Sequence, residues 1–168
     1  MSLLLSAALA GSLNCWAAAA YRYYLPAELL YAIGSVESSH DRSARAVADN
    51  GTYSVGLMQI NSSWFSTLRT YGIEEHELLE PCINIQVGAW ILRQEVDRYG
   101  YSWEAIGAYY AGAHSPKTYR WKIRLYRKYA TKVIDRWQRL RTARRRAMPA
   151  PSALPNAHKA RLVSDAPP

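Results

Sequence analysis

One acidic residue of this chain stands where a proton-transfer reaction would need it. Glu37 follows Leu30 and Ile33 at intervals of seven and four residues, so on a helix its carboxyl group continues an apolar ridge. Loss of hydration there favours the neutral acid, and so does the negative end of the helix dipole. An acid that stays protonated near neutral pH can release a poor leaving group. The alternative interpretation is a plain surface glutamate at a helix end.

A second segment with chemical potential follows at residues 56–61, Gly-Leu-Met-Gln-Ile-Asn. Gly56 would let the backbone approach a ligand closely. Met58 and Gln59 are expected to line a cleft next to Glu37, once the polar loop before them folds back. Alternatively, Met58 fills a gap in the core and Gln59 only bonds within its own loop.

Several other kinds of site find little support in the sequence. The four histidines are scattered, and neither CxxC nor HxxxH spacing occurs, so we expect no metal site. No Gly-rich phosphate loop is present, and no cofactor is expected. A second carboxylate that could share the acid and base work with Glu37 is also hard to find. The nearest candidates are poor, because Asp41 lies in a polar stretch just after Glu37 and Asp49 lies at an expected hairpin tip.

Three blocks, in this order and at this spacing, resemble the signature blocks of the lysozyme-like lytic transglycosylases. They are Glu37-Ser38, the segment at 56–61, and Ala-Tyr-Tyr-Ala-Gly at 108–112. Cys15-Trp16 and the segments at 50–53, 81–85 and 88–92 are similar to the small, single-domain members that accompany secretion, conjugation and pilus systems. The similarity runs from about residue 14 to residue 112. It implies a mainly α, lysozyme-like single domain with a small β-hairpin or loop region beside the catalytic cleft.

The resemblance also implies a reaction. Such an enzyme cleaves the MurNAc-β-1,4-GlcNAc bond of peptidoglycan and leaves a 1,6-anhydro-MurNAc end, thereby opening the wall locally for an envelope-spanning apparatus. Glu37 would act first as the acid and then as the base. The position that holds a second carboxylate in animal lysozymes is Ser54 here. Two alternatives remain open, a hydrolytic muramidase and a non-catalytic peptidoglycan-binding assembly factor.

Further roles follow from the same resemblance. Ser54, Gly56, Met58 and Gln59 would contact the glycan. Tyr109 would form a hydrogen bond near the catalytic carboxyl and position the sugar.

Two neighbours of these residues have more than one interpretation. Ser38 could orient the carboxyl or the substrate's acetamido group, or could be a simple helix-end serine. The chain departs from the family pattern Ala-Tyr-Asn-Ala-Gly at Tyr110, which stands where Asn is expected.

The start of the chain indicates export. Residues 1–10 are apolar or small, as in the core of a secretory signal peptide, although Lys and Arg are missing from the first residues. A buried N-terminal helix is the alternative. In the periplasm or outside the cell, Cys15 and Cys82 would form a disulfide, and two buried thiols are the other interpretation.

The elements that must position these residues follow from helical periodicity and caps. We expect helices at 14–24 and 26–39, the second starting at Pro26, and at 62–70, 81–99 and 103–111. Asn61 and Ser102 are predicted to cap two of them. The turn signal at residues 49–51 predicts a loop or hairpin. Gly34 is expected to leave open space beside Glu37.

The end of the chain is strongly basic. Residues 117–146 contain 13 Lys and Arg against a single acid, Asp135, and apolar residues such as Tyr129 and Val133 recur at helical spacing. We expect a domain at 11–140 that ends in this helix, and a basic, Pro- and Ala-rich disordered tail at 141–168. The helix could contact an anionic envelope surface or simply be solvated. Binding of nucleic acid is the weakest alternative, because export would remove that partner.

Overall fold

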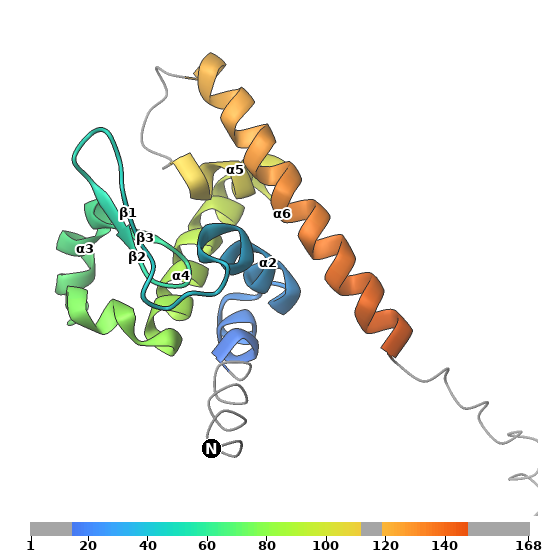
Figure 1. The fold of residues 1–168 in the computed structure, drawn as a ribbon, viewed down its shortest axis with the longest axis horizontal. Helices are drawn as coiled ribbons and strands as arrows, with labels where there is room; N and C mark the ends of the chain where they lie inside the picture. The colour runs from blue at the N-terminus through green and yellow to red at the C-terminus, as the bar shows by residue number, and fades with distance from the viewer. Residues whose placement is uncertain (1–14, 112–118, 148–168) are drawn as a thin grey trace, which may run out of the picture.

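The computed structural model describes residues 15–111 and 119–147. Within these ranges the fold is mainly helical with one small antiparallel sheet, which confirms the predicted lysozyme-like class (Figure 1). After a helix at residues 15–23 come α2 (Ala27–Ser38), β1 (Arg45–Val47), β2 (Tyr53–Val55), β3 (Ile60–Asn61), η1 (Ser62–Trp64), α3 (Phe65–Thr70), η2 (Glu75–Leu79), α4 (Pro81–Tyr99), α5 (Trp103–Ala111) and α6 (Tyr119–Ala147). The expected signal segment at 1–10 lies outside the described residues.

Local sequence signals set most helix boundaries. α4 begins at Pro81 and ends before Gly100, as predicted. The Asn61 side chain accepts a hydrogen bond from the Ser63 N–H at 3.0 Å, which confirms its role as a cap. Ser102 does the same for Ala105. The prediction for Pro26 is wrong by one position, because Pro26 has the extended backbone of an N-cap and α2 starts one residue later.

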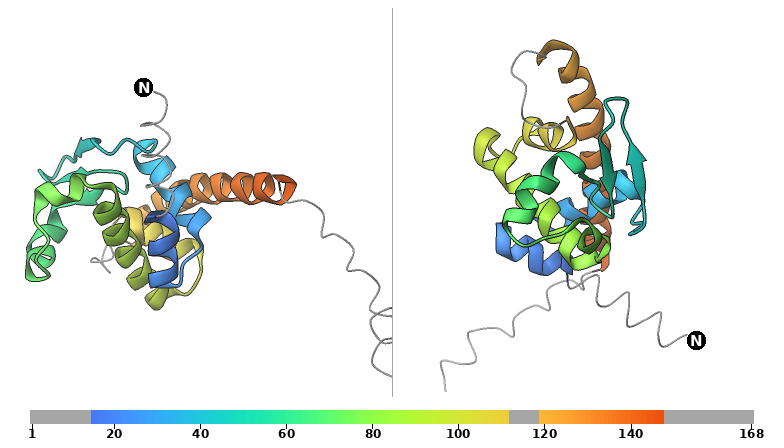
Figure 2. Two further views of the ribbon diagram at one scale, coloured as in Figure 1. Left: turned by 90° about the horizontal axis from the view of Figure 1, so that it is seen from below. Right: turned by 90° about the vertical axis from the view of Figure 1, so that its left-hand side faces the viewer.

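The helices form two parts of the molecule with α4 between them. The sheet and α3 lie on one side of α4, and α2, α5 and α6 lie on the other (Figures 1 and 2). The core that joins the parts contains five fully buried side chains. They are Leu30 and Ile33 of α2, Ile85 and Leu92 of α4, and Val133 of α6. Burial of the α2 stripe therefore fixes the helix that carries Glu37.

The three strands pair in the order β1-β2-β3, with Ala46 opposite Ser54 and Ser54 opposite Asn61. The predicted hairpin at residues 49–51 is confirmed: the Asn50 carboxamide accepts from the Thr52 N–H at 3.1 Å, and Gly51 has a φ of 78°. β3 was not predicted, because its two residues are too short to show alternation. The sheet brings the segment at 56–61 back toward α2.

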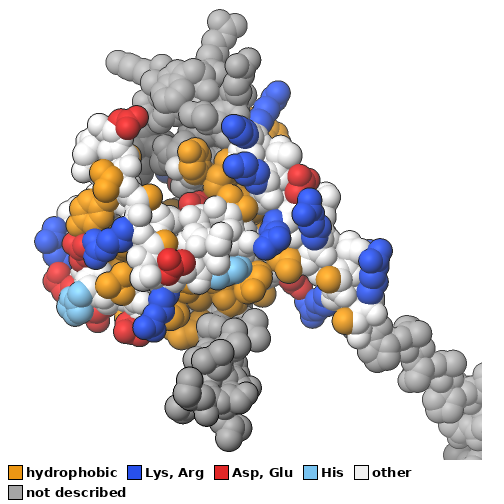
Figure 3. All heavy atoms as spheres, in the orientation of Figure 1, with side chains coloured by type: hydrophobic (Ala, Val, Ile, Leu, Met, Phe, Trp, Pro, Cys, Tyr) orange, Lys and Arg blue, Asp and Glu red, His pale blue; other side chains and the backbone are white. Residues whose placement is uncertain are grey.

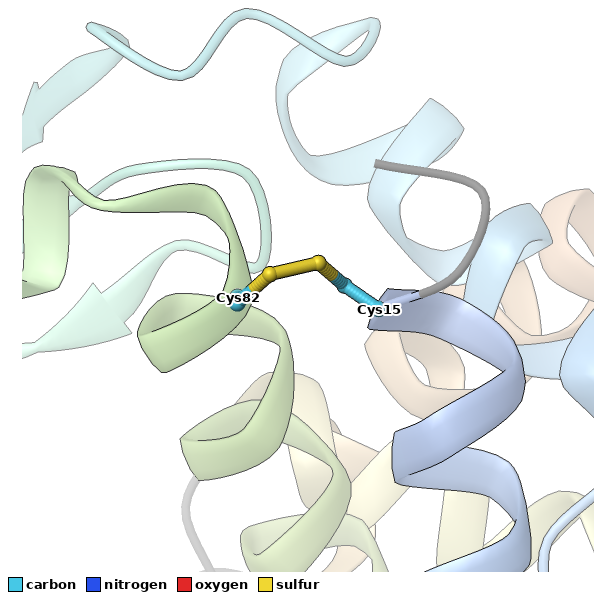
Figure 4. The surroundings of a disulfide bond; sticks show 2 residues. All are labelled: Cys15 and Cys82. Carbon is cyan, nitrogen blue, oxygen red and sulfur yellow. A yellow bond between two sulfur atoms is a disulfide. The ribbon is translucent and has the colours of Figure 1, made fainter. Parts of the chain in front are cut away.

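A disulfide between Cys15 and Cys82 joins the first helix to the first turn of α4, as predicted (Figure 4). The two Cα atoms are 5.1 Å apart, within the usual range for a disulfide. Beside the bridge, the Trp16 indole fills the space next to Gly34, where an added Cβ would lie 2.6 Å from the ring. The prediction of open space at Gly34 is therefore wrong; a glycine is needed so that the indole can pack against α2.

The basic helix α6 extends beyond the body of the molecule (Figure 2). Tyr129, Ala130 and Val133 are buried, so the turns of α6 around them pack against the domain as expected. The helix continues to Ala147, which corrects the disordered tail expected from residue 141; residues 148–168 lie outside the described part. Arg144 forms an ion pair with Glu28 of α2. Lys and Arg side chains gather along α6 in Figure 3. In the described ranges, no helix is long and apolar enough to cross a membrane.

The disulfide closes a separation of 67 residues. We expect the double variant Cys15→Ser/Cys82→Ser to lose about 2–4 kcal/mol of unfolding free energy, because the unfolded chain gains freedom. Urea unfolding with and without reductant measures this loss. Reductant should lower the midpoint of the wild type and leave the double variant unchanged. Equal midpoints for the oxidised wild type and the variant would contradict the expectation.

Candidate active site

The Glu37 carboxyl group lies in the last turn of α2, facing α6. The helix ends at Ser38, and Ser39 takes a left-handed conformation with a φ of 54°. α6 crosses this turn and places Tyr129 beside it. The Tyr129 hydroxyl donates a hydrogen bond to Oε1 of Glu37, although 92 residues separate the two in sequence. Docking of α6 on α2 therefore completes the surroundings of the acid.

Burial raises the pKa of Glu37 from its ordinary 4.5 to about 7, and the hydrogen bond from Tyr129 lowers it in part. The pKa of Tyr129 is itself raised well above 10 by burial and by the nearby carboxyl, so this phenol stays protonated and donates. At neutral pH about half of the Glu37 side chains would therefore hold a proton. The carboxyl can give a proton and, once ionised, keep a donor directed at it.

Tyr109 contributes to the same region from α5, with a hydrogen bond near the carboxyl group as expected. Its hydroxyl donates to the carbonyl oxygen of Met58 at 2.7 Å, rather than to Glu37. Burial and the nearby Glu37 carboxyl raise the pKa of Tyr109 well above 10. Tyr109 thus links α5 to the 56–61 segment close to the acid, while Tyr129 takes the direct bond.

The side chain of Met58 does not line an open cleft, which corrects that expectation. It is fully buried, and it packs where a side chain on Gly88 would collide with it, because an added Cβ would lie 2.7 Å from the Met58 Cβ. This agrees with the alternative interpretation of Met58 as core. The part of Met58 that reaches the site is its carbonyl group.

Gln59 has a left-handed backbone, with a φ of 49°, that turns its segment sharply. Its carboxamide nitrogen donates to the carbonyl oxygens of Gly56 at 2.9 Å and Ala44 at 3.2 Å. Both acceptors lie in the loops around the sheet, so the Gln59 amide nitrogen holds the turn together. Its bonding matches the alternative interpretation, in which Gln59 bonds within its loop.

A buried asparagine whose role was not predicted holds this turn against α4. Asn84 accepts a hydrogen bond from the Met58 N–H at 2.7 Å and donates to the carbonyls of Val55 at 3.0 Å and Leu78 at 2.8 Å. Gly56 makes room for it: with a φ of 78°, an added Cβ would lie 2.1 Å from the Asn84 amide. The need for Gly56 is thus close packing with Asn84.

The two candidate serines bond within the protein. The Ser38 hydroxyl donates to the carbonyl of Leu57 at 2.9 Å and lies 3.2 Å from that of Gly34, so it ties the end of α2 to the 56–61 segment. Ser54 lies on β2, where its hydroxyl accepts from the Asn61 carboxamide at 3.3 Å. Ser38 is therefore next to the acid in space as well as in sequence, while Ser54 belongs to the sheet.

Among the described residues, no other acidic group shifts the pKa of Glu37. Burial and Tyr129 account for the shifted pKa of Glu37, and no second carboxylate among the described residues contributes to it. Asp41 is exposed and accepts hydrogen bonds from Ser43, which lower its pKa. Within residues 15–111 and 119–147, no three His, Cys, Asp or Glu side chains are grouped in a way that could hold a metal ion.

The chain matches a known protein family and is similar in sequence to several known proteins. The family model for the transglycosylase SLT domain matches residues 14–132. The invasion protein IagB of Salmonella typhimurium is 43% identical over 129 residues, which cover 76% of this chain and 78% of IagB. Protein IpgF of Shigella flexneri is 38% identical over 131 residues, 77% of this chain and 83% of IpgF.

Among solved structures, the chain is similar to an inactive Glu-to-Gln mutant of the lytic transglycosylase Slt from Pseudomonas aeruginosa. The TM-score is 0.59 at 24% identity, and the match covers 76% of this chain. The chain spans 24% of the length of that protein. This likeness supports the lysozyme-like fold.

The raised pKa of Glu37 predicts how stability depends on pH. Because the folded pKa, about 7, exceeds the ordinary 4.5, the contribution of Glu37 to stability is fully present below pH 4.5 and is lost as pH rises through 7. A glutamine carries no such charge. Glu37→Gln should therefore match the wild type at pH 4.5 and be more stable at pH 8, by roughly 3 kcal/mol at most.

Urea unfolding of both proteins from pH 4 to pH 8 checks this. The difference in unfolding free energy between the two proteins isolates Glu37, because the other titrating groups are common to both. A difference that stays flat with pH would show that the carboxyl is solvated and its pKa ordinary.

Asn84→Ala should lose about 3 kcal/mol of unfolding free energy, because the Met58 N–H and the carbonyls of Val55 and Leu78 lose their partner. Asp97→Ala on the same helix is the control, because the Asp97 side chain is 66% exposed and pairs with Arg93 one turn away. The control should change stability by less than about 1 kcal/mol. Thermal or urea unfolding of both variants decides, and a loss in Asn84→Ala no larger than in the control would contradict the role given to Asn84.

Proposed function

This chain belongs to the transglycosylase SLT domain family of peptidoglycan lytic transglycosylases, and on that basis we propose that Glu37 is its catalytic acid and base. The substrate is the MurNAc-β-1,4-GlcNAc bond of the peptidoglycan glycan strand. The products are a free GlcNAc end and a 1,6-anhydro-MurNAc end. The observation that carries the proposal is the partly buried Glu37 carboxyl, with a pKa of about 7 and the Tyr129 hydroxyl bonded to it.

The first step uses the protonated form of Glu37. The carboxyl proton moves to the glycosidic oxygen as the bond from C1 of MurNAc to that oxygen breaks. The carbonyl oxygen of the substrate's own acetamido group stabilises C1. The Tyr129 hydroxyl favours the carboxylate that this step creates, because it donates a hydrogen bond to Glu37.

The second step uses the carboxylate. Glu37 takes the proton of the MurNAc 6-hydroxyl as that oxygen forms a bond to C1. The ring closes, Glu37 regains its proton, and no water is consumed. A single acid is enough for this sequence of steps. Because the pKa of Glu37 is about 7, its carboxyl group can donate a proton in the first step and accept one in the second.

The remaining residues hold the machinery in shape under this proposal. Gly56 and Gln59 form the turn that presents the Met58 carbonyl, which Tyr109 binds. The glycan would lie along this backbone, so that Met58 contributes its carbonyl and its side chain stays in the core. Ser38 keeps the turn close to the acid through its bond to the Leu57 carbonyl.

The relatives support a place for the enzyme in the cell. IagB is named as an invasion protein. We propose that this chain acts in the periplasm or outside the cell, where its disulfide forms, and that it opens the wall for a secretion, conjugation or pilus apparatus. Components of that apparatus would be its protein partners. Contact of the basic helix α6 with an anionic envelope surface would be compatible with this location.

Digestion of purified peptidoglycan sacculi tests the reaction. The wild type should release soluble fragments whose muramyl ends are anhydro, as measured by mass spectrometry. Glu37→Gln should release at least about a hundredfold less, because the general acid is lost. Glu28→Gln, the same substitution in the first turn of α2, is the matched control and should keep wild-type activity.

Each other result points to an alternative. Reducing muramyl ends would mean a hydrolytic muramidase. Release by Glu37→Gln at the wild-type rate would refute Glu37 as the acid. A wild type that binds sacculi without releasing fragments would mean a non-catalytic assembly factor.

A further inference from the structure

Tyr110, where the chain departs from the family pattern, lies in the last part of α5 with its ring stacked on that of Tyr129. The ring centroids are 4.7 Å apart, and the planes differ by 18°. Tyr110 is 51% exposed, whereas Tyr129 is 6% exposed. The outer ring therefore covers the inner one.

The inner ring is the one that touches the acid, through the bond from the Tyr129 hydroxyl to Glu37. Consecutive residues of a helix point about 100° apart. Tyr109 and Tyr110 accordingly serve different neighbours, since Tyr109 binds the Met58 carbonyl and Tyr110 packs on α6. α5 thus contacts the surroundings of Glu37 twice, through the Met58 carbonyl and through the Tyr129 ring.

We infer that Tyr110 is a positioning residue for the reaction: its ring fixes the Tyr129 phenol in line with the Glu37 carboxyl and keeps water from the bond between them. This rests on the proposed function of Glu37. Tyr110 acts through Tyr129, and its own hydroxyl is not needed. An asparagine at this position could not cover an aromatic face, so this chain uses the position differently from the family pattern.

Two opposite effects on the acid give this role a clear signature. Burial raises the pKa of Glu37, and the hydrogen bond from Tyr129 lowers it, with burial the larger effect. Removal of the covering ring loosens the hydrogen bond and also admits water; because burial is the larger effect, the pKa of Glu37 should fall. Removal of the Tyr129 hydroxyl alone should make it rise.

Several other ionisable groups lie near the last turn of α2. The Tyr109 and Tyr129 phenols face the carboxyl from α5 and α6, and both have raised pKa values. Lys132 and Arg136 lie further along α6, where with Asp135 and Arg139 they line a hollow of about 380 Å³ beside Ser35, Val36 and Ser39. Burial lowers the pKa of His40, and Arg136 lowers it further. These groups are common to every variant and cancel in differences.

The experiment compares the full-length wild type with Tyr110→Phe, Tyr110→Asn, Tyr110→Ala and Tyr129→Phe. It measures kcat and KM for glycan release across pH, and the fall of kcat/KM at high pH reports the loss of the Glu37 proton. Tyr110→Phe should match the wild type within about twofold, because it keeps the ring. Tyr110→Asn and Tyr110→Ala should lose roughly tenfold in kcat with little change in KM.

The pH profiles separate positioning from a merely structural role. In Tyr110→Asn and Tyr110→Ala the high-pH limb should move down by about half a unit, and in Tyr129→Phe it should move up. A wild-type kcat and pH limb in both Tyr110→Asn and Tyr110→Ala would overturn the inference. A loss in Tyr110→Phe as large as in Tyr110→Asn would also overturn it, since the hydroxyl would then matter.

An NMR titration of labelled glutamate carboxyl carbons reads the same acid without turnover, with Glu37→Gln assigning the signal. A lower pKa of Glu37 in Tyr110→Asn than in the wild type supports the role of Tyr110. An unchanged pKa contradicts it. If the wild type released no fragments, the proposed function would fail, and this titration would still decide whether Tyr110 controls the acid.

Discussion

The partial burial of one carboxyl group, with one phenol bonded to it, is the interaction on which the rest of this structure depends. The position of Glu37 is fixed, because the apolar stripe of α2 that includes Leu30 and Ile33 lies in the core. Tyr129 cannot reach it unless α6 packs across α2. Desolvation of an acid disfavours its charged form, so the packing that stabilises the fold also sets the chemistry of the site.

Several contacts hold the elements around Glu37 together. Asn84 holds the 56–61 segment against α4 through three hydrogen bonds to backbone groups. Ser38 joins that segment to α2, and Tyr109 joins it to α5. The disulfide at Cys15 ties the first helix to α4. Because the proposed reaction uses a single acid, its placement matters most, and these contacts hold the frame around Glu37 in shape.

Much of this arrangement could be predicted from local sequence. The helix at Pro81, the caps at Asn61 and Ser102, and the hairpin at Asn50 each depend on a few adjacent residues, and they were predicted with few errors. Long-range contacts were harder to predict. Tyr129 shares its helical spacing with Val133, so nothing nearby marks it as the partner of Glu37. Met58 was misplaced because its burial depends on Gly88, thirty residues away.

The central claim is that a lone, partly buried acid serves both steps while the substrate's own hydroxyl replaces water. Digestion of sacculi in water enriched in the heavy oxygen isotope tests this most directly, because only a hydrolytic step transfers solvent oxygen to the sugar. Mass spectrometry of the muramyl ends should show anhydro ends free of the label. Labelled, reducing muramyl ends that depend on Glu37 would contradict the account.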